Sequence, residues 1–346
     1  MTRREQLELA VTAAIVAAAA ALELLGAGDV VVFAATGVAL AALARTVGTA
    51  TEQLGSRLGS GSAGVVQSAL GNLPELFVAL FALHKGLEGV VQSALVGSVL
   101  ANSMLVLGLA FTVGGIRTGT QRFDSERARL ISTLTVLAAA TMAVPSLAHA
   151  FHTPAARHDE ALSLICAGVL LAIFVLTLPS FLRGVVGEQH EPARWSGRVT
   201  AVVLAFAAGG AALVSDWFVN ALTPAIHTLH MSEDFAGLVV VAIAGNAVEN
   251  VIGVQLAARG RPDFAISVIM SSSLQVALAL TPAIVFASLF FGTHLVLTFP
   301  VLLAFSLLLA GILGAIVVYD GEATWQEGTV LVGLYVVIAA SFWWGT

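Results

Sequence analysis

Long apolar runs, separated by short charged or turn-forming stretches, follow one another along the whole chain. A membrane-spanning α-helix needs about 20 mostly apolar residues, whereas the strands of a membrane barrel alternate over roughly 10. The runs at 11–25 and 161–182 are continuous and do not alternate. The pattern therefore predicts an all-α polytopic membrane protein with about eleven transmembrane helices. The predicted spans are residues 9–25, 30–53, 62–83, 88–113, 125–148, 158–182, 199–222, 233–257, 262–290, 295–319 and 324–344.

Composition agrees with a location in a bilayer. Hydrophobic residues make up 58% of the chain and charged residues 10%, which is too apolar for a water-soluble domain. Arg3 and Arg4 precede the first apolar run without a convincing cleavage site, so we expect a retained first helix and not a signal peptide. Pro282 lies inside the ninth span, which is expected to tilt or break there.

The basic residues predict which ends of the spans face the cytoplasm. With eleven spans, one side carries Arg3, Arg4, Arg57, Arg117, Arg122, Arg127, Arg129, Arg183, Arg194, Arg198, Arg259 and Arg261. The other side carries only Lys85 and Arg157, and Arg45 falls within a span, where we expect it to snorkel or to pair with an acid and not to bind substrate. Because cytoplasmic loops are enriched in Lys and Arg, the N-terminus is predicted to be cytoplasmic and the C-terminus outside, in the inner (cell) membrane.

A five-residue motif occurs twice. GNLPE at 71–75 in the third span returns as GNAVE at 245–249 in the eighth, 174 positions later. Each copy of the repeat then contains five spans. Because five is odd, the second copy enters the membrane with the opposite orientation, so the two copies form an inverted repeat. A binding site is expected where the two copies meet. The predicted organisation is an N-terminal helix (1–28), a first five-helix repeat (29–183), a cytoplasmic linker (184–198) and a second repeat (199–346).

The repeated motif predicts a cation site. Glu75 and Glu249 lie inside spans, where an acidic side chain costs about 2.5 to 3.5 kcal/mol and usually marks function. Asn72 and Asn246 stand three residues earlier, so on a continuous helix each would share a face with its glutamate. Calcium takes six to eight oxygen ligands, whereas neither motif holds the thiolate or imidazole that zinc favours. Further predicted residues are the close-approach glycines Gly71 and Gly245 and the polar residues Ser98, Asn102, Ser271, Ser272 and Gln275. Glu52 and Asp216 are either a cation relay or interfacial acids at helix ends.

Burial also links the site to protons. A carboxylate in a low-dielectric site favours its protonated form when no cation is bound, so cation and protons compete for it. If both glutamates take a proton when the metal leaves, two protons replace one divalent cation. The glutamates therefore serve both as metal ligands and as proton carriers in this hypothesis.

At these residues the chain resembles the calcium/proton exchanger (CAX) family of the cation/calcium exchanger superfamily. The likeness extends to TEQL at 51–54 and GSVLAN at 97–102 and covers roughly residues 30–290. The resemblance implies an antiporter with one regulatory first helix and two five-helix repeats, in which Glu75 and Glu249 hold calcium beside Asn72 and Asn246. This chain departs from many relatives in carrying Asn250, where they have a histidine.

The predicted function is calcium/proton antiport by alternating access, by a secondary transporter and not an enzyme. Ca²⁺ is the transported substrate, and no cofactor or nucleic acid is expected; the partners are Ca²⁺, H⁺ and the lipid bilayer, and a homo-oligomer is left open. A sodium/calcium exchanger, or another divalent cation exchanger of the same superfamily, is the nearest alternative. An intramembrane protease is a weaker one, because the chain has no H-E-x-x-H and its acids are paired glutamates.

Overall fold

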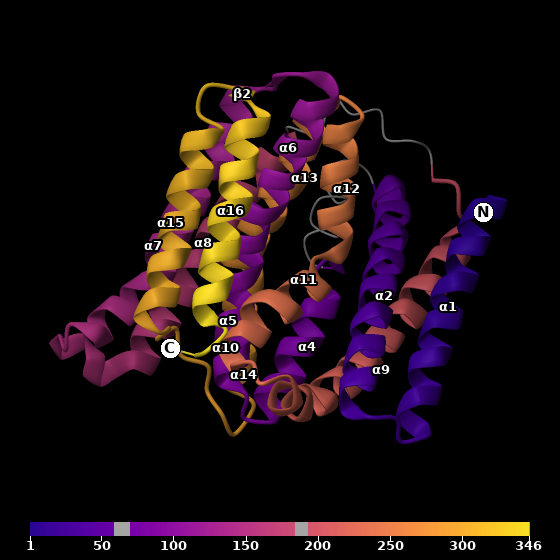
Figure 1. Cartoon of the computed structure of the whole chain (residues 1–346), viewed down its shortest axis with the longest axis horizontal. Helices are drawn as coiled ribbons and strands as arrows, with labels where there is room; N and C mark the ends of the chain where they lie inside the picture. Colours follow the sequence, from indigo (N-terminus) through magenta and orange to yellow (C-terminus); the bar gives the residue numbers. More distant parts are fainter. Residues whose placement is uncertain (59–69, 184–192, 346) are drawn as a thin grey trace. The chain divides into compact units, whose positions relative to one another are not determined.

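The structure is a computed structural model that describes residues 1–58, 70–183 and 193–345 (Figure 1). The chain divides into two compact units, which are described separately. Unit 1 comprises Met1–Ala82, Ile173–His230 and Ala244–Val248, and unit 2 comprises Leu83–Ala172, Met231–Ile243 and Glu249–Thr346.

Helices account for nearly all the regular structure. They are α1 (Arg3–Leu24), α2 (Asp29–Leu58), α4 (Leu73–His84), α5 (Glu88–Leu100), η1 (Ala101–Val106), α6 (Leu107–Thr118), α7 (Ser125–Ala150), η2 (Pro154–His158), α8 (Asp159–Arg183), α9 (Gly197–Leu229), α10 (Glu233–Phe235), η3 (Ala236–Val241), α11 (Ala242–Gly245), α12 (Ala247–Ala258), α13 (Pro262–Gln275), η4 (Val276–Leu280), α14 (Thr281–Ser288), α15 (Val301–Val317) and α16 (Trp325–Phe342). Two short strands, β1 (Gln121–Arg122) and β2 (Glu322–Ala323), pair antiparallel. Segments η1, η3 and η4 are π-helical, and η2 is a 3₁₀-helix.

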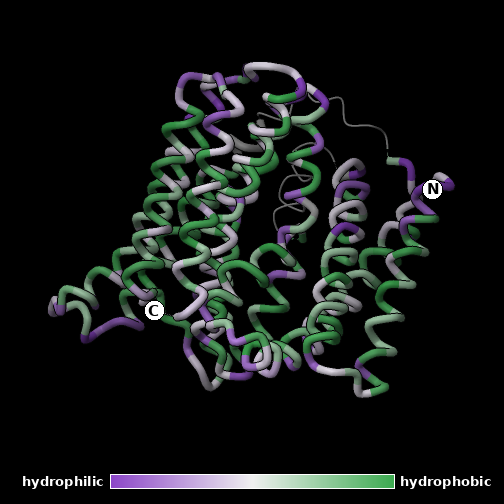
Figure 2. Tube along the Cα trace, in the orientation of Figure 1, coloured by the Kyte–Doolittle hydropathy of each residue, from purple (hydrophilic) through white to green (hydrophobic). Residues whose placement is uncertain are grey.

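Each predicted apolar segment contains a helix. Among the described residues, eight helices are long and apolar enough to cross a membrane, and one further bent pair, Glu233–Gly245 with Glu249–Ala258, passes the same criterion jointly. Two shorter apolar helices, α4 and α15, account for the remaining segments. Figure 2 shows hydrophobic residues along the helices and hydrophilic ones gathered at their ends. A multi-pass helical membrane protein is thus confirmed, while the number of spans stays a prediction.

In unit 1, α2 packs along α9, and α1 packs against α2 (Figure 1). The Arg45 guanidinium lies 3.0 Å from the Glu8 carboxylate, the pairing expected for a basic residue within a span. The Gln53 side-chain oxygen accepts hydrogen bonds from the backbone N–H groups of Arg194 and Trp195, at 2.8 and 3.2 Å. The end of the predicted linker is therefore anchored to the last turns of α2, and residues 184–192 lie outside the described part.

In unit 2, α15 packs on α7, α16 on α6, and η3 on α5. The last of these contacts is a close approach of two backbones. A Cβ on Gly97 would lie 2.3 Å from the Leu238 carbonyl oxygen, and a Cβ on Gly237 would lie 2.5 Å from that of Val90. Because such distances exclude any side chain, the two glycines allow α5 and η3 to touch.

Three loops meet at one end of unit 2, and the predicted spans place all three on the cytoplasmic side of the membrane. Strand β1 pairs with β2, and the Arg122 guanidinium lies 3.1 Å from the Glu322 carboxylate. The backbone N–H of Asp124 donates to the Asp263 carboxylate at 2.7 Å. The loops after α6, α12 and α15 thus lie together, as the predicted alternation requires.

The other end joins segments predicted on the outer side. The N–H of Ser232 donates to the Trp343 carbonyl at 3.1 Å, linking the start of α10 to the end of α16. His294 Nδ1 lies 2.9 Å from Glu160 Oε1, linking the loop before α15 to the start of α8. These contacts support the predicted alternation of the loops, and which end faces the cytoplasm stays a prediction.

The tenth and ninth predicted spans differ in detail from the structure. The tenth begins at Val301 and not at 295, because residues 294–300 are not helical and their buried backbone is hydrogen-bonded by serine side chains. Ser146 donates to the Leu297 carbonyl at 3.0 Å and accepts from the N–H of Phe299 at 2.8 Å. The ninth span does not break at Pro282, which instead lies in the first turn of α14, directly after the π-helix η4.

Candidate functional site

Both copies of the repeated motif lie where a helix starts. Gly71 and Asn72 form a turn before α4, and Asn246 separates α11 from α12. The expectation that each asparagine shares a helix face with its glutamate is therefore wrong, because the asparagine precedes the helix that carries the glutamate. Pro74 fits this position, since an N–H in the first turn has no intrahelical partner to lose.

The breaks place both glutamates in first helical turns. Glu75 lies in the first turn of α4, and Glu249 in the first turn of α12. A helix N-terminus carries a partial positive charge and unpaired N–H groups, so it stabilises a carboxylate. At the second break, the helices before and after it meet at 65°. Discontinuous helices with free backbone groups are the usual components of ion sites in inverted-repeat transporters.

Unit 1 brings Glu75 into contact with residues of the second motif. The Asn246 amide donates a hydrogen bond to Glu75 Oε1. A Cβ on Gly245 would lie 2.5 Å from Glu75 Cγ, so any larger residue here would have to displace Glu75 or the turn. Asn246 is 1% exposed and Asn72 is 8% exposed. The first glutamate is thus held against the Gly-Asn pair of the other repeat, at a buried position.

Unit 2 brings together the polar residues of the fourth and ninth predicted spans. The Asn102 amide donates to the Ser272 hydroxyl at 3.2 Å, and Ser103 Oγ lies 3.0 Å from Ser273 Oγ. The other three predicted supporting residues lie on the same helices: Ser98 is buried on α5, and Ser271 and Gln275 are half-buried on α13.

Ser103 and Ser273 were missed by the sequence reasoning. The sequence did offer one indication of these two serines, because each directly follows a predicted residue, Asn102 or Ser272. Each of the two hydrogen bonds joins residues that are 170 positions apart, so neighbouring residues form neighbouring bonds between the same two helices.

The candidate relay residues occupy the long helices of unit 1. Glu52 is exposed, six residues before the end of α2. Asp216 is half-buried near the middle of α9 and accepts a hydrogen bond from Asn220 at 3.2 Å. Helix α9 extends to Leu229, so Asp216 is further from the helix end than the predicted span suggested. The relay through these two acids stays a prediction.

Among the predicted site residues, Glu75, Gly245 and Asn246 are therefore brought together in unit 1, and Asn102 with Ser272 in unit 2. Glu249 belongs to unit 2, and its convergence with Glu75 stays a prediction. Within the described part of the chain, no group of three or more histidine, cysteine or acidic side chains forms a ready metal cluster. Any cation held here would take carbonyl, amide and hydroxyl oxygens in addition to carboxylates.

An inverted helical repeat with glutamates at helix breaks defines a secondary transporter of the inverted-repeat class. The chain belongs to the sodium/calcium exchanger family, whose model, described as sodium/calcium exchanger protein, matches residues 28–183 and 199–344. The resemblance noted from the two motifs is thereby confirmed.

Individual relatives match over nearly their whole length. The Ca(2+)/H(+) antiporter ChaA of Bacillus subtilis is 33% identical over 321 residues, covering 90% of this chain and 92% of that protein. The Ca(2+)/H(+) antiporter of Synechocystis is 30% identical over 347 residues, covering 92% of each. The solved structure of native YfkE has a TM-score of 0.84 at 30% identity, covering 97% of this chain and 99% of that one. The H+/Ca2+ exchanger CAX, at 14% identity and a TM-score of 0.78, shares the fold.

Proposed function

We propose that this protein exchanges Ca²⁺ for H⁺ across the membrane by alternating access. The observation that carries the proposal is the pair of helix breaks, each of which places a glutamate in the first turn after a Gly-Asn pair. Relatives named as Ca(2+)/H(+) antiporters, at 30–33% identity over 90–92% of this chain, support calcium and protons as the ions.

In this mechanism Glu75 and Glu249 bind the cation with oxygens from both repeats, and protonation releases it. The hydrogen bond from the Asn246 amide orients one oxygen of Glu75, so the carboxylate is held by the opposite repeat before a cation arrives. When the cation leaves, protons neutralise the carboxylates. The protein can then change back to its other conformation without carrying an unpaired charge in the membrane interior. Two protons would then be exchanged for each Ca²⁺.

The test is calcium flux in proteoliposomes that contain the purified protein. Calcium uptake driven by an imposed proton gradient is expected, together with proton movement in the opposite direction. Uptake that follows a sodium gradient and ignores a proton gradient would establish the alternative, sodium/calcium exchange, which the description of the family model favours.

The glutamate variants test the site. Glu75→Gln and Glu249→Gln keep the shape of each side chain but remove the charge and the titrating proton, so each is expected to lower proton-driven calcium uptake by at least a hundredfold. Glu88→Gln, at the start of α5, is the matched control and should transport normally. Full activity in either motif variant would refute the assignment of that glutamate.

The remaining features follow from the same proposal. We place the protein in the cell membrane with a cytoplasmic N-terminus, because twelve of its fifteen basic residues fall on that side of the predicted spans. Calcium is then the transported substrate and not a resident cofactor.

A further inference from the structure

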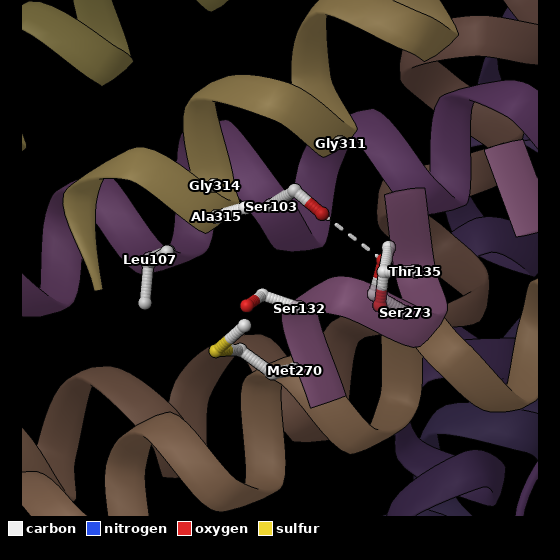
Figure 3. Close-up of a pocket in the computed structure, with 9 residues that line it drawn as sticks. All are labelled: Ser103, Leu107, Ser132, Thr135, Met270, Ser273, Gly311, Gly314 and Ala315. Carbon is white, nitrogen blue, oxygen red and sulfur yellow. Dashed lines mark hydrogen bonds between the residues drawn. The ribbon is translucent and has the colours of Figure 1, made fainter. Parts of the chain in front are cut away.

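A small cavity in unit 2 is lined by hydroxyl groups that the proposed cation site does not use. The hydroxyl-bearing residues are Ser103, Ser132, Thr135 and Ser273, and two glycines of α15, Gly311 and Gly314, form part of the wall (Figure 3). The four hydroxyl residues are at most 7% exposed. The cavity has room for about one water molecule, and a polar cavity of that size usually holds one.

Four helices surround the cavity, and they form two pairs related by the inverted repeat. The first pair is η1 with its continuation α6, from the fourth predicted span, and α13, from the ninth; the second pair is α7 and α15. Ser103 lies in the π-helix η1, and π-helical turns are frequent at functional sites. The cavity therefore lies where equivalent parts of the two repeats meet within unit 2.

Existing hydrogen bonds determine what the cavity can bind. Ser132 donates to the Arg129 carbonyl at 3.0 Å and Thr135 to the Ile131 carbonyl at 2.9 Å, so these two hydroxyls offer acceptor lone pairs to the cavity. Ser273 can donate to Ser103 at 3.0 Å or to the Val99 carbonyl at 3.5 Å, and the Ser103 hydroxyl hydrogen is available to the cavity when Ser273 donates to Ser103. A water molecule can donate to the first two and accept from the Ser103–Ser273 pair, which makes three bonds.

We infer that this cavity holds a water molecule through which protons pass between the β1–β2 end of unit 2 and the Asn102–Ser272 pair. The inference rests on the proposed function and assigns protons a route apart from that of the cation. None of the described residues that line the cavity is charged. A bare cation would therefore be unpaired in the membrane interior, whereas neutral water is satisfied by hydroxyls.

The position of the cavity fits such a route. Ser132 lies seven residues after the start of α7, about 10 Å along the helix axis from the end that carries β1. On the inner side, Ser103 and Ser273 directly follow Asn102 and Ser272 in the sequence. Along these hydrogen bonds a proton passes from Ser103 to the water while the water passes one of its own to Ser132. Transfer in the opposite direction follows once the hydroxyls and the water have rotated, and each group gives up one proton for each that it accepts.

Gly314→Ala tests the inference by filling the cavity. The new Cβ would lie 3.7 Å from Ser103 Cβ, an ordinary contact, so the methyl group displaces water without forcing the backbone apart. Gly333→Ala in α16 is the matched control, because no atom lies within 4 Å of the new Cβ and the helix-propensity gain is the same. Calcium/proton exchange and calcium/calcium exchange are measured for both variants in proteoliposomes, since the second mode moves no protons.

Gly314→Ala is expected to slow calcium/proton exchange at least fivefold and to leave calcium/calcium exchange unchanged, while Gly333→Ala alters neither. Thr135→Val should resemble Gly314→Ala, and Thr135→Ser should restore the proton-coupled rate. Normal proton-coupled exchange in Gly314→Ala, or equal slowing of both modes, would overturn the relay while wild-type transport remains intact. A wild-type protein that moves no calcium would instead overturn the proposed function and the relay with it.

Discussion

Gly245 shows how one residue position can depend on a residue in the other repeat. A Cβ at this position would lie 2.5 Å from Cγ and 3.1 Å from Oε1 of Glu75, and these contacts leave no space for a methyl group. Gly245→Ala therefore has to displace the glutamate or the turn, at a cost of about 1–3 kcal/mol. We expect lower thermal stability in detergent and at least a tenfold loss of calcium transport, measured side by side. Gly209→Ala in α9, where the new Cβ meets nothing within 4 Å, should match the wild type.

Asn246 acts on the same carboxylate through its amide. A hydrogen bond to a charged group contributes about 1.5–3 kcal/mol, so Asn246→Ala should leave Glu75 poorly oriented. The expected outcome is a rise of about tenfold or more in the calcium concentration for half-maximal uptake, measured with radioactive calcium. Asn220→Ala removes a similar amide-to-carboxylate bond, to Asp216, outside the two motifs and should change this concentration less than Asn246→Ala does. Equal effects of the two variants would contradict a specific role for Asn246.

At the scale of helices, the pattern of apolar residues predicted where helices lie but not where they are interrupted. A hydropathy window averages over about 19 residues, so a two-residue turn such as 71–72 is invisible between apolar flanks. For the same reason the non-helical stretch before α15 was assigned to a span, because residues 295–299 are mostly apolar. Two prolines in the sequence indicate where these helices begin: Pro74 lies in the first turn of α4, and Pro300 immediately precedes α15.

The contact between α5 and η3 depends on two glycines that sequence reasoning did not single out. Gly97→Ala and Gly237→Ala would each bring a methyl group within 2.3–2.5 Å of a backbone carbonyl oxygen on the other helix. Since neither backbone can move alone, each variant should lower the unfolding temperature by several degrees and reduce the yield of folded protein. Gly168→Ala in α8 has open space around the new Cβ and is the control. Unchanged unfolding temperatures in both glycine variants would contradict the close approach.

At the scale of the whole chain, the repeat inferred from two motifs is also visible in helix geometry. The π-helix η1 interrupts the fourth predicted span at 101–106, and η4 interrupts the ninth at 276–280, close to the spacing of the motifs. Equivalent helices also pack in pairs: α2 with α9 in unit 1, and α7 with α15 in unit 2. A sequence comparison of the halves could not foresee the π-helices, because their extra residue per turn depends on packing and leaves no distinct residue pattern.

An odd number of spans places the two chain ends on opposite sides of the membrane, and cysteine labelling can test this arrangement. Cys166 is the single cysteine, so Cys166→Ser provides a background without thiols. In that background, Ala155→Cys, exposed in the 3₁₀-helix η2 before α8, is expected to react with an impermeant maleimide in intact cells. Arg259→Cys, exposed after α12, should react only after the membrane is opened, because its loop belongs to the arginine-rich end. The reverse pattern would invert the orientation, and labelling of both residues in intact cells would show that the predicted span count is wrong between them.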